Sequence, residues 1–445
     1  MPSSSTGKTR SIFALVDCDN FFVSCERVFR PDLWNRPVAV LSNNDGCIVA
    51  RSNEVKAMGI PMAAPYFQFK KELKAADVTL FSANFSLYGD FSQRVVRILE
   101  AYTPRLEVYS VDESFLEISD LPIEDYAEWA LELRRHIKSW TGIPVSIGVA
   151  PTKTLAKAAA ERAKHHPELG GAFSVLSDSV HSREDAEEQR VKLLRETELK
   201  DVWGVGRRLG PRLRDRGITT AYDLSQVSEK WARQAMSIRG LRTVKELQGE
   251  AHYDIEDETA PQKQLAVTRT FPYKIRAYNE LEARIATFSA KAGHRLRRQR
   301  QISGAILVFL AGDKHREEEV YRRVTTVVPL LQATSDTGTL IKTALQGLDT
   351  LYDPDFSYKR AGVMLLDLSS ERAKQLSWLI HEDPSLDKRR SRLMETVDKL
   401  NDKYHSELIW HAAEQRLQAG PWRKATRKSP AYTTRWSDLP ELHLV

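Results

Sequence analysis

Two short clusters of acidic residues lie inside segments that otherwise read as buried β-strands. Asp17-Cys18-Asp19 ends the apolar run IFALVDC, and Asp112-Glu113 lies within LEVYSVDESFLEIS. Burying an ionised carboxylate is costly unless a positive charge compensates it. A pair of Mg²⁺ ions would supply that charge, because Mg²⁺ binds carboxylate and phosphate oxygens. The clusters therefore indicate a two-metal site for phosphoryl chemistry, against the alternative that these acids merely end their strands.

The backbone around the acids decides which of them can share a metal. Residues two apart in a strand face the same way, so Asp17 and Asp19 begin on one face with a backbone carbonyl between them. The adjacent Asp112 and Glu113 both face an ion only where the strand bends or ends, and Ser114 with the apolar run after it allows a hairpin there. We expect Asp17, Asp112 and Glu113 to hold two ions, which activate an attacking hydroxyl and bridge nucleotide phosphates.

The elements that must position these acids follow an α/β pattern over residues 11–175. The expected strands are 12–18, 36–42, 106–112 and 144–150, and the expected helices are 124–140 and 152–166. Residues 31–84 contain several Pro and Gly residues, interrupt the pattern and read as a small inserted subdomain.

The rest of the chain divides by composition. Residues 190–262 are mostly helical and end in a polar stretch that reads as a linker. Residues 263–368 return to an α/β pattern, with strands in 264–271, 303–310 and 321–328 and a basic helix between the first two. From about Ser369 the sequence is polar and charged, and no repeat of fixed period is found.

Composition bounds the class of protein. The chain has 445 residues, 42% hydrophobic and 28% charged, with a net charge of +6, which describes several globular domains with a modest preference for an anionic partner. Three cysteines near the N-terminus build neither a disulfide framework nor a zinc site. The N-terminal segment is too polar for a signal peptide, and no apolar run could span a bilayer. We expect a cytoplasmic protein with no membrane partner.

Five segments, in order along the chain, carry a resemblance to a known family. They are VDCDNFFVSCE (16–26), SNNDGCIVARSNEVKAMGI (42–60), YSVDESFLEIS (109–119), IGVAPTKTLAKAAAE (147–161) and VWGVGRR (202–208). The chain closely resembles the Y-family translesion DNA polymerases, most of all their UmuC branch, which includes the catalytic subunit of DNA polymerase V and its plasmid- and element-borne relatives. The resemblance extends to SPAYTTRWSDLP near the C-terminus.

The resemblance implies an α+β multidomain fold with a right-hand polymerase architecture. Its parts are a ferredoxin-like palm, small fingers, a helical thumb with a helix-hairpin-helix, and an α/β little finger domain. The implied boundaries are palm 1–30 and 85–188, fingers 31–84, thumb 189–251, linker 252–264, little finger 265–368 and C-terminal tail 369–445.

The resemblance also assigns roles at the acidic site. It implies that Asp17, Asp112 and Glu113 are catalytic ligands of two Mg²⁺ ions, assisted by the carbonyl of Cys18, whereas Asp19 is not a constant ligand. Phe22 falls at the steric gate, where an aromatic ring under the nucleotide sugar would collide with a 2′-hydroxyl.

Four further residues are candidates for binding the nucleotide. Phe21 adjoins the gate, although it also reads as a core residue. Lys157 matches the lysine that reaches the triphosphate, with a solvated helix face as the alternative. Lys56 stands where many relatives carry an arginine, and a lysine there loses the bidentate fork. Arg51 is a nearby candidate for the same role, or else a surface residue.

Two basic segments are candidates for gripping DNA. Gly204 and Gly206 form a turn whose N–H groups can approach a phosphate, and a helix C-cap followed by a turn is the alternative. The candidate contacts in the two segments are Gly204, Gly206, Arg207 and Arg208 in the first, and Arg295, Arg297 and Arg298 in the second. The second set lies in a predicted helix and would make binding sensitive to salt, unless it is only a solvated face.

The tail carries a candidate peptide for a protein partner. The segment 375–379 resembles the peptide with which bacterial polymerases bind the sliding clamp, with Gln375, Leu376, Trp378 and Leu379 as its contacts, or else forms an ordinary amphipathic turn. The resemblance further implies a UmuD-derived dimer and RecA as partners, besides primer-template DNA and a deoxynucleotide.

The expected function is error-prone, template-directed DNA synthesis past damaged bases in the SOS response. The acids alone would also fit a nucleotidyl cyclase or a two-metal nuclease, but the thumb-like turn, the basic helix and the tail argue against a cyclase. A clamp- and DNA-binding protein without activity is a third possibility, which the intact Asp17, Asp112 and Glu113 argue against.

Overall fold

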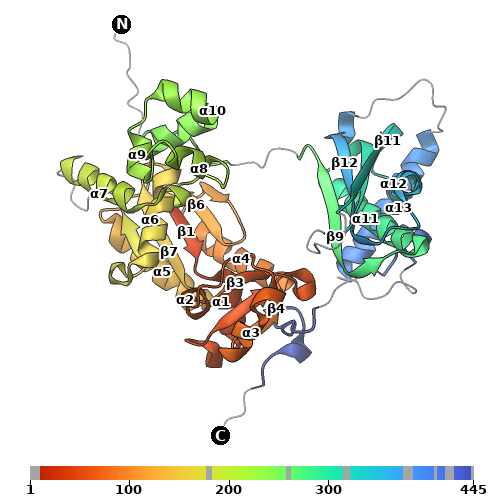
Figure 1. The fold of residues 1–445 in the computed structure, drawn as a ribbon, viewed down its shortest axis with the longest axis horizontal. Helices are drawn as coiled ribbons and strands as arrows, with labels where there is room; N and C mark the ends of the chain where they lie inside the picture. Colours follow the sequence, from red (N-terminus) through yellow and green to blue (C-terminus); the bar gives the residue numbers. More distant parts are fainter. Residues whose placement is uncertain are drawn as a thin grey trace. The chain divides into compact units, whose positions relative to one another are not determined.

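The computed structural model describes residues 11–176, 183–256, 262–313, 321–373, 384–404, 408–415 and 425–441. They belong to two compact units, which are described separately. The first unit comprises Met1–Thr259 together with Ala425–Val445, and the second comprises Ala260–Lys424 (Figure 1). Among the described residues, no helix is both long and apolar enough to cross a membrane.

A five-stranded sheet in the order β5-β6-β1-β7-β8 forms the centre of the first unit. Its strands are β1 (Phe13–Cys18), β5 (Leu106–Val108), β6 (Glu113–Glu117), β7 (Val145–Ala150) and β8 (Ala172–Ser174). Strand β1 lies in the middle and pairs antiparallel with both β6 and β7. The acidic cluster at the end of β1 is therefore held between two neighbouring strands.

The side chains of β1 alternate between two cores, as the period of a strand requires. Ala14, Val16 and Cys18 pack with the helices on one face, which are α1 (Phe21–Phe29), α4 (Phe85–Glu100) and α5 (Tyr126–Thr141). Phe13 and Leu15 pack on the other face against α6 (Lys153–His165) and the helices that follow it. The alternation places Asp17 on the α6 face.

Helix α6 lies very close to β7, and a glycine makes this possible. A Cβ atom on Gly148 would lie 2.2 Å from the carbonyl oxygen of Ala156 and 2.2 Å from the backbone nitrogen of Ala160. A side chain at position 148 would therefore push the helix away from the sheet. Gly148 thus sets the distance between the lysines of α6 and the acids of β1.

The inserted segment forms its own small sheet in the order β3-β2-β4. Its strands and helices are β2 (Val38–Leu41), β3 (Ile48–Arg51), α2 (Asn53–Ala57), α3 (Tyr66–Ala75) and β4 (Thr79–Ser82), with short 3₁₀ turns at Pro31–Leu33 and Asn43–Asp45. Ala39, Leu41, Ile48 and Val55 contribute to a separate core of this sheet.

The helical segment after the palm sheet folds against α6. It contains the helices α7 (Arg183–Glu196), α8 (Leu209–Arg214), α9 (Ala221–Ser225) and α10 (Glu229–Leu247), with a 3₁₀ turn at Leu199–Asp201; another 3₁₀ turn, Pro167–Leu169, lies between α6 and β8. Leu194, Val205 and Val244 share one core with Leu155 of α6, so the helices are part of the same hydrophobic cluster as one face of the palm sheet.

A buried glutamate ties these helices to the palm. The Glu246 side chain is fully buried, and its carboxylate accepts hydrogen bonds from the backbone N–H groups of Thr154 (3.0 Å), His252 (2.6 Å) and Tyr253 (3.1 Å). One side chain thus fixes the start of α6, the end of α10 and the chain that leads out of the unit.

We expect Glu246→Ala to lower the free energy of unfolding by about 3 kcal/mol, because it leaves buried N–H groups without an acceptor. Urea denaturation followed by circular dichroism would measure the loss. Glu229→Ala is the matched control, because Glu229 lies on the same helix and makes an exposed ion pair with Lys245. An equal effect of the two substitutions would contradict this role of Glu246.

The second unit is a four-stranded antiparallel sheet in the order β11-β10-β12-β9. Its strands are β9 (Leu265–Ile275), β10 (Gln301–Ala311), β11 (Arg323–Thr334) and β12 (Tyr358–Ser370). Helices α11 (Tyr278–Arg298) and α12 (Thr337–Leu351) pack on the sheet around Phe288, Ile306 and Leu340. Helix α13 (Pro384–Lys403) and a 3₁₀ turn at Ala412–Glu414 add to α11, since Asp398 pairs with Arg297.

The predicted strands and helices of the two α/β segments agree with this structure apart from their ends. The hairpin expected at the second acidic cluster is present between β5 and β6, where the backbone N–H groups of Tyr109 and Ser110 both donate to the carbonyl of Glu113. The expected strand 106–112 accordingly ends at Val108.

Candidate active site

The register of the palm sheet brings the two acidic clusters together. Asp17 and Glu113 are directly paired across β1 and β6, and the backbone N–H of Cys18 donates to the carbonyl of Asp112 at 2.8 Å. Because Phe115, two residues after Glu113, packs in the same core as Leu15, Glu113 lies on the α6 face of the sheet together with Asp17. Residues far apart in sequence thus form one site.

The hairpin between β5 and β6 presents Asp112 beside Glu113. The Ser110 hydroxyl donates to a carboxylate oxygen of Asp112 at 2.5 Å and accepts from the backbone N–H groups of Asp112 (3.2 Å) and Glu113 (3.0 Å). These hydrogen bonds hold the bend that the two adjacent acids need in order to face one site. Ser110 was not predicted, although its place in the YSVDE segment is the signal that could have found it.

Two lysines of α6 bind the two paired acids. The Nζ of Lys157 lies 2.7 and 2.8 Å from the carboxylate oxygens of Glu113, and the Nζ of Lys164 lies 2.9 Å from Oδ1 of Asp17. Lys157 also lies over the ring of Tyr109, 5.2 Å from its centroid. The lysines therefore serve as counter-charges for acids that burial would otherwise destabilise.

The protonation of this pair reflects its surroundings. Burial raises the pKa of Asp17 from 3.8 to about 7; Lys164 opposes the rise, while Glu113 and Asp19 add to it. Burial lowers the pKa of Lys164, but the charge and hydrogen bond of Asp17 outweigh it and leave the value raised. A further positive charge beside Asp17 would therefore favour its ionised form.

Lys164 was not predicted as a site residue. Lys153 shares a helix face with Lys157 by its spacing, but its side chain does not bind the acids of the site. Lys153 is buried and pairs with Glu107 and the carbonyl of Asp254. Lys164 lies seven residues after Lys157, which is two turns of a helix, so helical periodicity was the signal that could have identified it.

The donor set fits divalent cations by its chemistry. Asp17, Asp112 and Glu113 supply hard carboxylate oxygens, and the buried chain at Cys18 supplies a backbone carbonyl. Within the described ranges, no group of three or more acidic, His or Cys side chains is already gathered as tightly as a metal site requires. Lys157 and Lys164 instead occupy the carboxylates of Glu113 and Asp17.

Asp19 has hydrogen-bond partners of its own beside the three acids. Strand β1 ends at Cys18, so Asp19 lies in the turn before α1, and its charge still raises the pKa of Asp17. Its Oδ1 accepts a hydrogen bond from the Ser146 hydroxyl at 2.8 Å, and its carbonyl accepts one from the Ser24 hydroxyl at 2.6 Å. These bonds give Asp19 a role in holding the turn.

The two aromatic residues that open α1 have different surroundings. Phe21 is 3% exposed and belongs to the core, so the candidate role of Phe21 in nucleotide binding finds no free surface. Phe22 is half-buried, and its ring stacks on Tyr88 with 4.4 Å between centroids and 13° between planes. Phe22 therefore keeps a supported, partly exposed ring.

The two candidate triphosphate residues of the fingers, Lys56 and Arg51, lie in α2 and at the end of β3. Lys56 is exposed on α2, and desolvation with the nearby charges of Lys164 and Arg51 lowers its pKa. The guanidinium of Arg51 donates to the carbonyl of Ile60, and burial lowers its pKa. Lys56 is thus the exposed side chain of the two, whereas Arg51 is engaged within the inserted segment.

The predicted DNA-binding segments lie one in each unit. Gly204 (φ +90°), Gly206, Arg207 and Arg208 form the turn before α8, where Gly206 and both arginines are exposed. On α11, Arg295 and Arg298 are exposed. Arg297 is not free for a phosphate, because its guanidinium forms a two-pronged ion pair with Asp398 of α13 at 2.7 and 2.8 Å.

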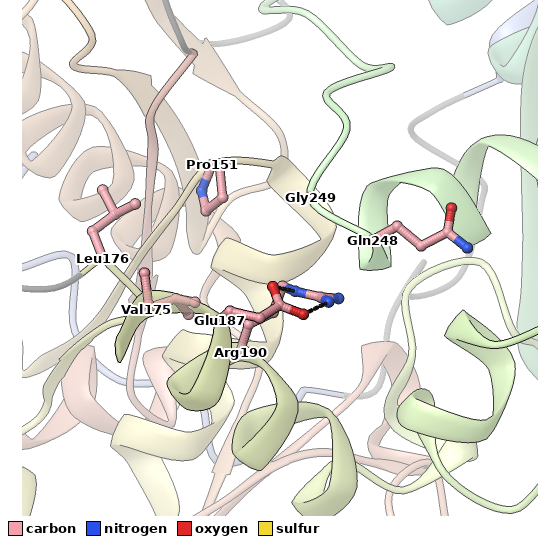
Figure 2. A pocket seen from close by; sticks show the side chains of 8 residues that line it. Pro151, Val175, Leu176, Glu187, Arg190, Gln248 and Gly249 are labelled. Carbon is pink, nitrogen blue, oxygen red and sulfur yellow. Dashed lines mark hydrogen bonds and ion pairs between the residues drawn. The ribbon is translucent and has the colours of Figure 1, made fainter. Parts of the chain in front are cut away.

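Two other regions lie apart from the acidic site or outside the described residues. The candidate clamp peptide, with Gln375, Leu376, Trp378 and Leu379, lies outside the described residues. A small cavity lies at the junction of the palm with α7 and α10, away from the acids (Figure 2). Arg190 and Glu187 pair on its wall, and Pro151, Val175 and Gln248 also line it. The cavity carries no group of catalytic side chains.

Comparisons with known proteins agree with this fold. Solved structures of a Y-family DNA polymerase chimera of Dbh and Dpo4 (TM-score 0.63, 21% identity) and of an insertion ternary complex of Dbh DNA polymerase (TM-score 0.53, 20% identity) each match 81% of this chain and 99% of theirs. The fold is thus that of the Y-family DNA polymerases.

Relatives in sequence define the branch. Protein SamB of Salmonella typhimurium is 37% identical over 97% of this chain and 100% of its own, and protein UmuC of Salmonella typhimurium strain LT2 is 36% identical over 96% and 99%. Three family models match the chain: the impB/mucB/samB family over residues 16–161, the C-terminal domain of that family over 262–378, and a domain of unknown function over 391–442. The chain belongs to the impB/mucB/samB family, the UmuC branch of the Y-family DNA polymerases, and is a DNA-directed DNA polymerase.

Proposed function

We propose that the protein copies damaged template DNA by adding deoxynucleotides to a primer, as part of the SOS response. The pairing of Asp17 with Glu113 beside Asp112, on a palm sheet of this family, is the observation that carries the proposal. In the reaction, the primer 3′-hydroxyl oxygen bonds to the α-phosphorus of the nucleotide, the bond to the β-phosphate oxygen breaks, and pyrophosphate leaves.

Asp17, Asp112, Glu113 and the Cys18 carbonyl would hold two Mg²⁺ ions. Bound there, the ions would supply activation of the hydroxyl and neutralisation of phosphate charge. In the free protein Lys157 binds the anionic carboxylate of Glu113. With Mg²⁺ on Glu113, the same ammonium group would bind the triphosphate, which is also anionic. Lys164 would be released from Asp17 in the same way. Lys56, whose pKa is lowered in part by the charge of Lys164, would add a positive charge from the fingers for binding the nucleotide.

One prediction tests whether Lys164 stands in for a metal. Lys164→Met should lower the melting temperature in the absence of metal, because it leaves Asp17 buried without its cation, at a cost of about 1–3 kcal/mol. Added Mg²⁺ should then raise the melting temperature of the variant more than that of the wild type. Differential scanning fluorimetry with and without Mg²⁺ measures both.

Lys192→Met is the control for the loss of a lysine, because Lys192 lies on α7 and outside the acidic site. An equal Mg²⁺ shift in wild type, Lys164→Met and the control would contradict binding of the metal at Asp17.

Contacts with DNA are proposed for the exposed basic groups. Gly206, Arg207 and Arg208, with the left-handed turn at Gly204, would bind backbone phosphates through N–H groups and charge. Arg295 and Arg298 would add charge from the second unit, whereas Arg297 holds α13 instead. These contacts read no bases, which suits an enzyme that accepts any template.

Protein partners are proposed from the family. A sliding clamp bound through the 375–379 peptide, a UmuD-derived dimer and RecA filaments would bring the enzyme to stalled primers. The test is extension of a primer on intact and damaged templates, with and without these partners. Failure to extend under every condition would reject the proposed function.

A further inference from the structure

The C-terminal segment 425–441 folds back onto the first unit. Lys428 forms a parallel β-bridge with Ser82, the last residue of β4, and the backbone N–H of Ser82 donates to the carbonyl of Arg427 at 3.0 Å. Tyr432 stacks on Phe29 of α1 with 4.3 Å between ring centroids. The segment is the last part of the domain whose function is unknown, and it is tied to both the fingers and the palm.

Ser429 is the buried contact of this segment. Its side chain is 7% exposed, and its hydroxyl donates to Oε1 of Glu26 at 3.1 Å. The side-chain amide of Asn84, the residue before α4, donates to the same hydroxyl at 3.0 Å and to the carbonyl of Pro430 at 3.3 Å. The segment thus supplies one of the polar partners of a carboxylate deep in the palm.

Glu26 links Ser429 to Tyr88, the residue whose ring stacks on Phe22. Glu26 is 1% exposed, and the same Oε1 accepts a second hydrogen bond from the Tyr88 hydroxyl at 2.7 Å. Tyr88 is also 1% exposed, and its ring is the one stacked on Phe22. Tyr88 is therefore fixed at its hydroxyl by Glu26 and presents its ring face to Phe22.

Among the described residues, the Phe22 ring has the aromatic neighbours Phe21, Phe85 and Tyr88. Phe22 and Glu26 are four residues apart on α1 and so lie on the same side of the helix. Phe85 touches the Phe22 ring edge-on at 5.9 Å, but Phe85 is itself 48% exposed. The stacked face of Tyr88 is the buried, hydrogen-bonded support of that ring.

We propose that the C-terminal segment sets the position of the Phe22 ring through Ser429, Glu26 and Tyr88, and thereby helps the enzyme reject ribonucleotides. This inference rests on the proposed function, in which Phe22 lies under the sugar. A ring can exclude the 2′-hydroxyl of a ribonucleotide by steric collision only if the ring does not move aside. The Phe22 ring moves less when it is stacked on the Tyr88 ring, which is itself fixed by a hydrogen bond. Ser429 and Tyr88 are then positioning residues, which do not touch the nucleotide themselves.

The test uses the full chain and measures kcat/KM for a ribonucleotide and for the matching deoxynucleotide in single additions. Loss of one hydrogen bond in Ser429→Ala or Tyr88→Phe should raise the ribonucleotide-to-deoxynucleotide ratio about 3- to 10-fold, while kcat/KM for the deoxynucleotide changes less. Ser437→Ala is the matched control, because Ser437 lies in the same segment, is exposed, and bonds only to its neighbour Asp438 among the contacts described.

The outcomes separate the inference from the proposed function. If the wild type extends no primer, the proposed function fails first. If Phe22→Ala relaxes sugar selection but Ser429→Ala and Tyr88→Phe match Ser437→Ala, the inference alone is overturned. If the two variants lose both substrates equally and melt at lower temperature, the segment serves stability only, and the inference is again overturned.

Discussion

Asp112→Ala is expected to lower the rate of primer extension by about a thousandfold or more, while DNA binding and melting temperature stay close to those of the wild type. The loss follows because this carboxylate would hold Mg²⁺, which would neutralise negative charge on the phosphate in the transition state, and such stabilisation is worth several kcal/mol. The fold should tolerate the change, because the described hydrogen bonds of the Asp112 side chain reach only Ser110 within the hairpin. Single-turnover extension measures the rate without product release.

Asp19→Asn is the matched control for this loss. The amide keeps an acceptor for the Ser146 hydroxyl, so the turn before α1 should persist. We expect extension within about tenfold of the wild type, because Asp19 is outside the proposed ligand set. If Asp19→Asn abolished extension and Asp112→Ala did not, the assignment of the ligands would be reversed.

Phe22→Ala is expected to raise the use of ribonucleotides relative to deoxynucleotides by about a hundredfold, which is the scale on which a pocket can reject one added hydroxyl. The ratio of the two kcat/KM values, measured in single additions, reports the change. Some loss of stability should accompany it, because the ring of Phe22 packs on Tyr88 and Phe85.

Phe22→Tyr separates the gate from this loss of packing. Tyrosine keeps the ring and its stack on Tyr88, so selection against ribonucleotides should be retained. Unchanged selectivity in Phe22→Ala, or an equal relaxation in Phe22→Tyr, would remove Phe22 from the role of gate.

The acidic site could be predicted from the sequence because its features are local. A carboxylate in an apolar strand stands out at Asp17 and at Asp112-Glu113, and the strand and helix patterns around them are strongly periodic. The sequence allowed a hairpin at Asp112-Glu113 but did not identify Ser110 as the residue whose hydroxyl holds it. It took the β1–β6 register to show that Asp17 pairs with Glu113.

Contacts between residues far apart in the sequence could not be predicted. Arg297 reads as one of several equivalent cations on a basic helix, but Asp398 of α13 takes up its guanidinium. The return of Ser429 to Glu26 likewise joins the two ends of the chain. Neither pairing has a periodic or local signal, because each depends on how separate elements pack.

The measurement that tests the central claim most directly is single-nucleotide addition to a primer opposite each of the four template bases and opposite a damaged base. The purified protein is supplied with Mg²⁺, the clamp, the UmuD-derived dimer and RecA filaments. The proposed function predicts that the added nucleotide follows the intact template base, that addition also occurs opposite the damaged base, and that both are lost in Asp112→Ala. No addition, addition that ignores the template, or full activity in Asp112→Ala would contradict a polymerase centre at Asp17, Asp112 and Glu113.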